Sequence, residues 1–127
     1  MPQSAIFRRN QSEPYYFKER CIIRELSNSE LDPAVSIAEA TVAVNTSTCW
    51  HRLAGTWERY IILAGEGRVE LGDDLTELVK KGDTVVIPAD TPQRITNIGN
   101  ENLIFLAICS PRFQPSVYID LEGDKDC

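Results

Sequence analysis

The sequence predicts an all-β domain of the antiparallel sandwich or barrel type. Short runs rich in β-branched and aromatic residues alternate with turn formers at intervals of roughly 8 to 12 residues, a spacing typical of such folds. No segment shows the sustained period of apolar residues that a helix requires. The chain of 127 residues has the length of one domain with one core. We expect a flexible N-terminal segment over residues 1–14, a single barrel domain over 15–121 and an acidic tail over 122–127.

The N-terminal half contains several expected strands. An aromatic cluster at Tyr15 to Phe17 precedes a β-branched run over 21–26, and turn formers separate this run from a longer strand over 35–44. Residues 49–53 are expected to be extended. After a bend, the run over 57–63 is a strong strand because aromatic and β-branched residues dominate it.

The C-terminal half continues the pattern with shorter strands. We expect these strands over residues 68–71, 75–79, 84–87, 93–97 and 103–109. Glycine-rich turns flank the first of them, whose alternating residues indicate one face open to water. Pro88 ends the strand over 84–87 because proline cannot donate to a sheet. The run over 103–109 is the most apolar in the chain and is expected in the core.

Charge and composition exclude several classes of function. The net charge of −6 and the lack of a basic run argue against a surface for nucleic acids or anionic membranes. No apolar stretch approaches the roughly 20 residues of a membrane helix, and no apolar block follows the first arginines as in a signal peptide. We therefore expect a cytoplasmic protein whose four cysteines are thiols.

Two stretches carry a spacing pattern that points to a family. The first has the form H-x-L-x4-E-x6-G and comprises His51, Leu53, Glu58 and Gly65. The second has the form G-x5-P-x-D-x2-Q-x3-N and comprises Gly82, Pro88, Asp90, Gln93 and Asn97. Both resemble the paired motifs of the cupin superfamily, in which histidines stand at the positions of Leu53 and Gln93. The resemblance covers residues 35–110 and implies a cupin-type antiparallel β-barrel, also described as a double-stranded β-helix or jelly roll.

The resemblance also implies a metal site inside the barrel. The matched positions His51, Glu58 and Gln93 are expected to face the lumen together and to bind a divalent transition metal (Fe, Mn, Zn or Ni). An imidazole nitrogen, a carboxylate oxygen and an amide oxygen resemble a facial triad with open positions. We expect weak affinity because Leu53 supplies no ligand and the amide of Gln93 is uncharged. His51 is the single histidine of the chain, so one subunit cannot supply a histidine-rich cage.

A barrel without metal is the alternative. In that case His51 and Glu58 form a hydrogen-bonded pair in a pocket for an organic ligand. A buried, unpaired Glu58 favours a nearby cation because it otherwise costs several kcal/mol or takes up a proton. Tyr60 shares the expected lumen with Glu58, which makes Glu58 and Tyr60 the candidate catalytic residues. Cys49 is either a soft extra ligand or a small buried hydrophobe.

Three functions stay open on these grounds. The first is an enzyme, of oxygenase or isomerase/cyclase type, that uses a bound metal to act on a small organic molecule. The second is a metal-free barrel that binds or senses a small molecule without catalysis. The third is an interaction protein that uses its acidic surface. The resemblance further implies a homodimer formed by sheet extension, to which residues 15–26 are expected to contribute.

Overall fold

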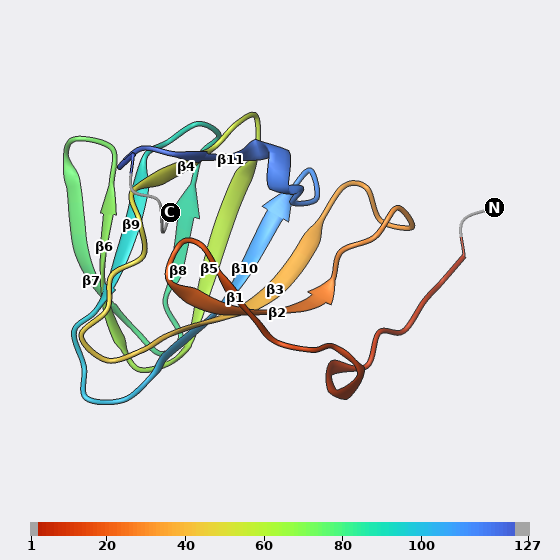
Figure 1. The fold of residues 1–127 in the computed structure, drawn as a ribbon, viewed down its shortest axis with the longest axis horizontal. Coiled ribbons are helices and arrows are strands. Elements are labelled where there is room, and N and C mark those ends of the chain that lie inside the picture. Colours follow the sequence, from red (N-terminus) through yellow and green to blue (C-terminus); the bar gives the residue numbers. More distant parts are fainter. Residues whose placement is uncertain (1–2, 124–127) are drawn as a thin grey trace.

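Two antiparallel sheets face each other in the computed structural model, which describes residues 3–123 (Figure 1). The first sheet has the strand order β1-β2-β3-β10-β5-β8 and the second has the order β11-β4-β9-β6-β7. The bounds are β1 Tyr15–Phe17, β2 Cys21–Ser27, β3 Ser36–Val42, β4 His51–Leu53, β5 Trp57–Ala64, β6 Glu66–Leu71, β7 Leu75–Lys80, β8 Thr84–Ile87, β9 Gln93–Asn97, β10 Leu103–Ser110 and β11 Tyr118–Asp120. The expected all-β barrel is therefore confirmed.

The expected strands are present with small shifts at their ends, and the structure adds two more. These are β1 and β11, each of three residues, which pair with β2 and β4. Two short 3-10 helices, η1 (Arg9–Gln11) and η2 (Pro115–Val117), complete the secondary structure of the described residues. Within residues 3–123, no helical segment has the length and apolar character that a membrane-spanning helix requires.

The core lies between the two sheets. Alternate residues of each strand point inward, so β5 buries Glu58, Tyr60 and Ile62 while Trp57 lies exposed on the outer face. Ile62 and Ile95 are almost fully buried and belong to one apolar cluster. Burying each such side chain contributes about 1.5–3 kcal/mol to folding.

Two motif positions shape the turns that hold the barrel. Gly65 has a φ of +84°, and a Cβ at this position would lie 2.7 Å from the carbonyl oxygen of Asn102. Glycine is therefore required here for both its conformation and its small size. Asp90 stands where the family motif has glycine and adopts a φ of +65°. Its carboxylate accepts hydrogen bonds from Arg52 and from the backbone N–H of Gly55, which offsets the backbone strain.

The N-terminal segment lies over the first sheet. Arg9 forms an ion pair with Glu39 on β3, and Arg24 on β2 donates to the carbonyl oxygens of Arg9 and Ser12. Residues 1–14 were expected to be flexible, but these contacts attach part of this segment to the outer face of the barrel. The acidic tail expected over 122–127 lies largely outside the described residues.

Candidate functional site

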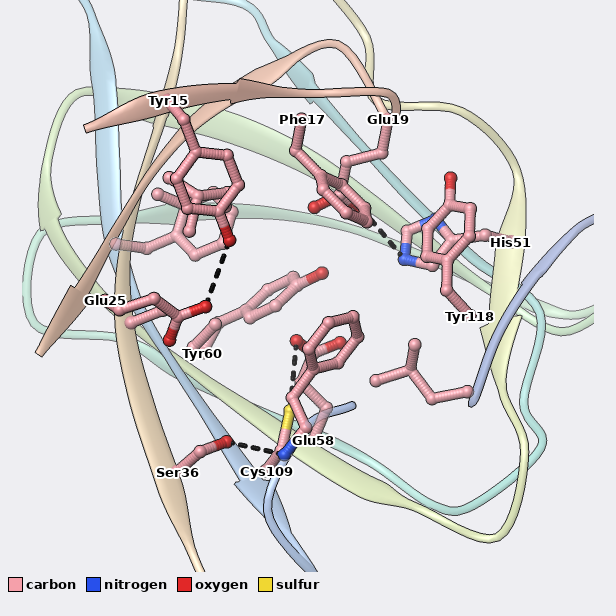
Figure 2. Close-up of a pocket in the computed structure, with 17 residues that line it drawn as sticks. Tyr15, Phe17, Glu19, Glu25, Ser36, His51, Glu58, Tyr60, Cys109 and Tyr118 are labelled. Atoms are coloured by element: carbon pink, nitrogen blue, oxygen red, sulfur yellow. Dashed lines mark hydrogen bonds and ion pairs between the residues drawn. The ribbon is translucent and has the colours of Figure 1, made fainter. Parts of the chain in front are cut away.

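A cavity of about 50 Å³ opens between the sheets and holds most of the titratable side chains that face inward (Figure 2). Its walls come from the β1–β2 hairpin and from strands β3, β4, β5, β10 and β11. The polar lining side chains are Tyr15, Glu19, Glu25, Ser36, His51, Glu58, Tyr60, Cys109 and Tyr118. The rest of the lining is apolar, so the polar groups act in a medium of low dielectric constant.

The structure brings the four expected site residues together. His51, Glu58, Tyr60 and Gln93 are 2%, 8%, 4% and 1% exposed, respectively. His51 and Gln93 are direct cross-strand partners of β4 and β9. Glu58 and Tyr60 lie two residues apart on β5 and share its inner face. The expected convergence of these side chains inside the barrel is therefore observed.

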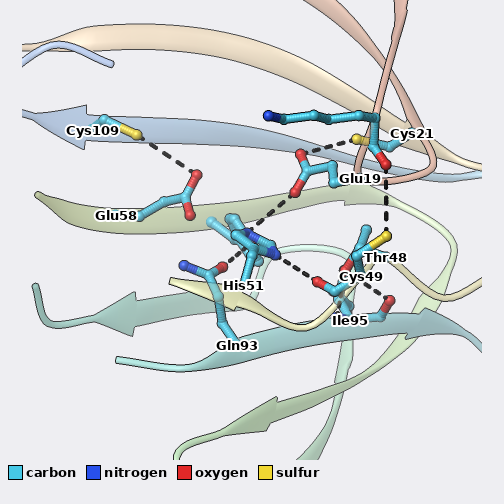
Figure 3. Close-up of polar contacts among 11 residues, drawn as sticks. Glu19, Cys21, Thr48, Cys49, His51, Glu58, Gln93, Ile95 and Cys109 are labelled. Carbon is cyan, nitrogen blue, oxygen red and sulfur yellow. Dashed lines mark hydrogen bonds and ion pairs between the residues drawn. The ribbon is translucent and has the colours of Figure 1, made fainter. Parts of the chain in front are cut away.

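His51 is held through both ring nitrogens (Figure 3). Nδ1 lies 2.6 Å from the carbonyl oxygen of Cys49, and Nε2 lies 3.2 Å from Oε2 of Glu19. A carbonyl only accepts hydrogen bonds, so Nδ1 carries a proton. Nε2 thus faces a carboxyl oxygen of Glu19, a group with which an imidazole can exchange a proton.

Glu58 is the most perturbed acid of the site. Burial, followed by the negative charge of Glu19, raises the pKa of Glu58 from 4.5 to about 7, although His51, Gln93 and Cys109 counteract the rise. Its Oε2 lies 3.6 Å from the sulfur of Cys109, and its buried Oε1 has no hydrogen-bond partner among the described residues. At neutral pH this carboxyl group therefore exists in both protonation states, with one oxygen that lacks a hydrogen-bond partner among the described residues.

Tyr60 and Gln93 form a buried hydrogen bond that orients the amide. The Tyr60 hydroxyl donates to Oε1 of Gln93 over 2.5 Å. The nearby amide of Gln93 acts to lower the pKa of Glu58. Burial raises the pKa of the Tyr60 hydroxyl well above its ordinary value, and the nearby Glu58 raises it further. Tyr60 therefore keeps its proton and holds Gln93 in place.

The donor set does not form a metal site as it stands. Both nitrogens of His51 and the oxygen of Gln93 are already engaged, which leaves Oε1 of Glu58 as the one open ligand of the expected three. Across residues 3–123, no group of three His, Cys, Asp or Glu side chains is disposed to hold a metal ion. Binding an ion would require rearrangement of these contacts, and we derive no chemical step through a metal.

The cysteines play no evident chemical role at the site. Cys21 and Cys109 are free and buried, and burial, followed by the charges of nearby glutamates, raises the pKa of both thiols. Reactive thiolates need the opposite shift. Cys49 is fully buried and disulfide-bonded, so the expectation of a thiol is wrong at this position. Its carbonyl group, rather than its sulfur, contributes to the site by holding His51.

Glu19, Glu25 and Tyr118 line the cavity but were not predicted from the sequence. Glu19 lies in the turn between β1 and β2, Glu25 lies on β2, and Tyr118 comes from the short strand β11. The ring of Tyr118 stacks on His51 with centroids 4.9 Å apart. None of the three belongs to a motif. The alternation of Cys21, Ile23 and Glu25 along one strand was the one available signal, since it places an acid on an otherwise apolar face.

Comparison with known proteins assigns the family. The chain matches the family model described as a cupin domain over residues 38–109. This chain therefore belongs to the cupin family. An uncharacterised protein of Methanocaldococcus jannaschii is 42% identical to it over 103 residues, which cover 80% of this chain and 82% of that protein.

Solved structures share the fold at lower identity. The Streptomyces nucleoside dehydratase Pac13 has a TM-score of 0.79 at 12% identity, with 98% of this chain and 96% of that chain covered. The oxalate decarboxylase of Bacillus subtilis, which has Mn(II) centres, has a TM-score of 0.78 at 21% identity. That match covers 90% of this chain but 31% of the decarboxylase, so this chain spans about a third of its length. At these identities the likeness shows the fold alone.

Proposed function

We propose that this chain is a cupin enzyme that binds a small organic molecule in the barrel cavity and moves protons on it. The reaction is of the isomerase or cyclase type. Glu58 removes or returns one proton through its open Oε1, and the His51–Glu19 pair exchanges another at a second atom of the ligand. Proton removal at one atom and proton delivery at the other leave the ligand isomerised, with Glu58 protonated and the His51–Glu19 pair one proton short. Glu58 then releases its proton to solvent and the pair takes one up from solvent before the next turnover.

The protonation behaviour of Glu58 is the observation that carries this proposal. A general acid or base works best when its pKa lies near the working pH, because both of its forms are then populated. The pKa of Glu58 is about 7, and its Oε1 has no partner among the described residues. A carboxyl group kept in this state costs stability. Burial that serves the fold alone does not account for a cavity-lining carboxyl group with an unpartnered oxygen.

The surrounding residues support catalysis rather than passive binding. The Nδ1 contact with Cys49 fixes one nitrogen of His51, so any proton exchange occurs at Nε2, which faces Glu19. Gln93 and Tyr60 hold a buried hydrogen bond beside Glu58 and act as positioning residues. The apolar remainder of the lining excludes bulk water from the reacting groups.

Solvent deuterium provides the test when the substrate is unknown. The purified protein is incubated in deuterated buffer with a small-molecule extract, and mass spectrometry detects carbon-bound deuterium. We expect one compound to gain deuterium with the wild-type protein and to gain none with Glu58→Gln. The matched control is Glu77→Gln, because Glu77 is exposed on β7 and remote from the cavity lining. A compound that is retained by the protein but never labelled contradicts catalysis and favours a binding protein.

We propose metal-dependent chemistry as the second candidate. In this case a divalent transition metal (Fe, Mn, Zn or Ni) is held by His51, Glu58 and Gln93. The open Oε1 of Glu58 favours it, and the Mn(II) centres of the Bacillus subtilis decarboxylase show that this fold can hold such an ion. His51 would have to exchange Glu19 for the ion. Elemental analysis, described below, separates the two candidates.

A further inference from the structure

The charged groups that line the cavity are acidic, with one histidine among them. Glu19, Glu25 and Glu58 all contribute to the lining, whereas no Lys or Arg side chain among the described residues does so. His51 is the single basic group, and it is already paired with Glu19. The charge of Glu19 also acts to raise the pKa of Glu58, Cys109 and Tyr118.

One of these acids lines the cavity with a carboxyl oxygen that lacks a partner. Glu58 is 8% exposed, and its buried Oε1 accepts no hydrogen bond from any described residue. Glu25 is half-buried and accepts a hydrogen bond from the Tyr15 hydroxyl over 3.0 Å. Burial raises the pKa of Glu25, and the hydrogen bonds from Tyr15 and Asn28 only partly offset this. Glu58 therefore has an acceptor oxygen that no described protein donor satisfies.

Six aromatic rings form much of the remaining wall. The rings are those of Tyr15, Phe17, Tyr60, Phe105, Phe113 and Tyr118. Phe17 packs edge-on against Phe113 and Tyr118, with centroids 6.1 and 5.1 Å apart. The chain already uses one of these rings to hold a cation, since Nζ of Lys18 lies 4.8 Å from the centroid of Tyr118. Ring faces attract cations, and they do so more strongly where water is excluded.

We propose that the ligand of this cavity is a small organic cation, an ammonium compound whose charged nitrogen donates to Oε1 of Glu58 while its carbon skeleton contacts the aromatic wall. This inference rests on the proposed function, because it names the class of molecule on which the site acts. An anionic substrate such as a dicarboxylate or a phosphate ester would meet three carboxyl groups and no arginine or lysine. A bare metal ion would need ligands that are already engaged.

Calorimetry with three probes of one shape tests the charge of the ligand. The probes are isobutylammonium, isobutanol and isobutyrate, which are cationic, neutral and anionic. We expect isobutylammonium to bind the wild-type protein at least about tenfold more tightly than the other two, since a charge-assisted hydrogen bond replaces a neutral one. Glu58→Gln and, separately, Glu25→Gln should each weaken its binding, whereas Glu77→Gln should leave it unchanged.

The outcomes separate this inference from the proposed function. Equal binding of isobutanol and isobutylammonium, or tighter binding of isobutyrate, overturns the cationic ligand. If Glu58-dependent deuterium labelling persists in that case, the proposed function stands with a ligand of another charge. Stoichiometric binding of Mn²⁺ or Zn²⁺ that isobutylammonium does not displace also overturns the inference, in favour of a metal site. If the wild-type protein neither labels any compound nor binds any of the three probes, both the proposed function and the cationic ligand are contradicted.

Discussion

The carboxyl groups of Glu19 and Glu58 face one cavity, from the β1–β2 turn and from β5, with no lysine or arginine among its lining residues. After burial, the negative charge of Glu19 is the largest cause of the raised pKa of Glu58. One turn residue therefore tunes an acid that lies 39 positions later in the sequence (58 − 19 = 39). Glu19 has two effects at once, because its carboxyl group also contacts Nε2 of His51.

Removing the charge of Glu19 should lower the pKa of Glu58. We expect Glu19→Gln to move this pKa below about 7, since the repulsion that disfavours the ionised form is lost while burial persists. Carbon-13 NMR titration of the glutamate carboxyl groups measures the shift. Glu77→Gln is the matched control and should leave the titration of Glu58 unchanged. An unchanged pKa in Glu19→Gln would show that burial alone sets it.

The stability of the protein should fall between about pH 4.5 and pH 7. The folded state holds the Glu58 proton up to about pH 7, whereas the ordinary value is 4.5, so the stabilising contribution is complete at low pH and is lost as pH rises through this window. The shift corresponds to a loss on the order of 3 kcal/mol. Glu58→Gln should remove this pH dependence and be more stable than the wild type at about pH 8. Urea denaturation at both ends of the window measures the effect.

Elemental analysis decides between proton transfer and metal chemistry. We expect protein purified without a chelating tag to contain iron, manganese, zinc and nickel well below one equivalent, because His51 and Gln93 are engaged by protein partners. Plasma mass spectrometry measures the content. One equivalent of a metal that is lost in both His51→Ala and Glu58→Gln would support the second candidate instead.

Tyr60→Phe should separate positioning from catalysis. The variant removes the donor to Gln93 and leaves a buried amide oxygen unsatisfied, which costs about 1–3 kcal/mol of unfolding free energy. If Tyr60 acts only by holding Gln93, the variant should keep much of its deuterium-labelling activity but show a changed Glu58 pKa. Complete loss of labelling with an unchanged pKa would assign the hydroxyl a direct catalytic role.

Gly65→Ala should destabilise the barrel more than Gly82→Ala. Both glycines have positive φ, +84° and +93°, so each substitution carries about 1–2 kcal/mol of backbone strain. At Gly65 the new Cβ would also lie 2.7 Å from the Asn102 carbonyl oxygen, whereas at Gly82 nothing lies within 4 Å. Urea denaturation measures the unfolding free energy of both variants, and the difference between them gives the cost of the steric clash at Gly65. Equal losses would show that the β5–β6 turn moves to make room.

The motif residues were predictable from sequence because spacing within a strand fixes the face of the sheet. His51, Glu58, Tyr60 and Gln93 lie on strands whose bounds the sequence predicts closely, and alternation directs them inward. These residues do not form the expected set of metal ligands, because side chains from other segments of the chain already bind to them. Spacing cannot show that the oxygen of Gln93 is taken by Tyr60 or that His51 is taken by Glu19.

The parts that sequence reasoning missed are short and lack alternation. β1 and β11 have three residues each, too few to show a period of two. Glu19 lies in the turn that follows β1, where a charged residue ordinarily faces water. β1 forms one edge of the six-stranded sheet, a position from which a second copy can extend the sheet. The homodimer expected from residues 15–26 stays a prediction.

Glu19 lies on a hairpin loop rather than on a barrel strand. The chemical properties of the cavity can therefore evolve without changes to the strands that form the fold. Loops accept replacement, insertion and deletion far more readily than packed strands do. Exchange of the few residues that join β1 to β2 would therefore change the charge at the cavity and the partner of His51. The β-strands that form the barrel would stay unchanged. Grafting this loop between related barrels offers a compact route to new reactivity.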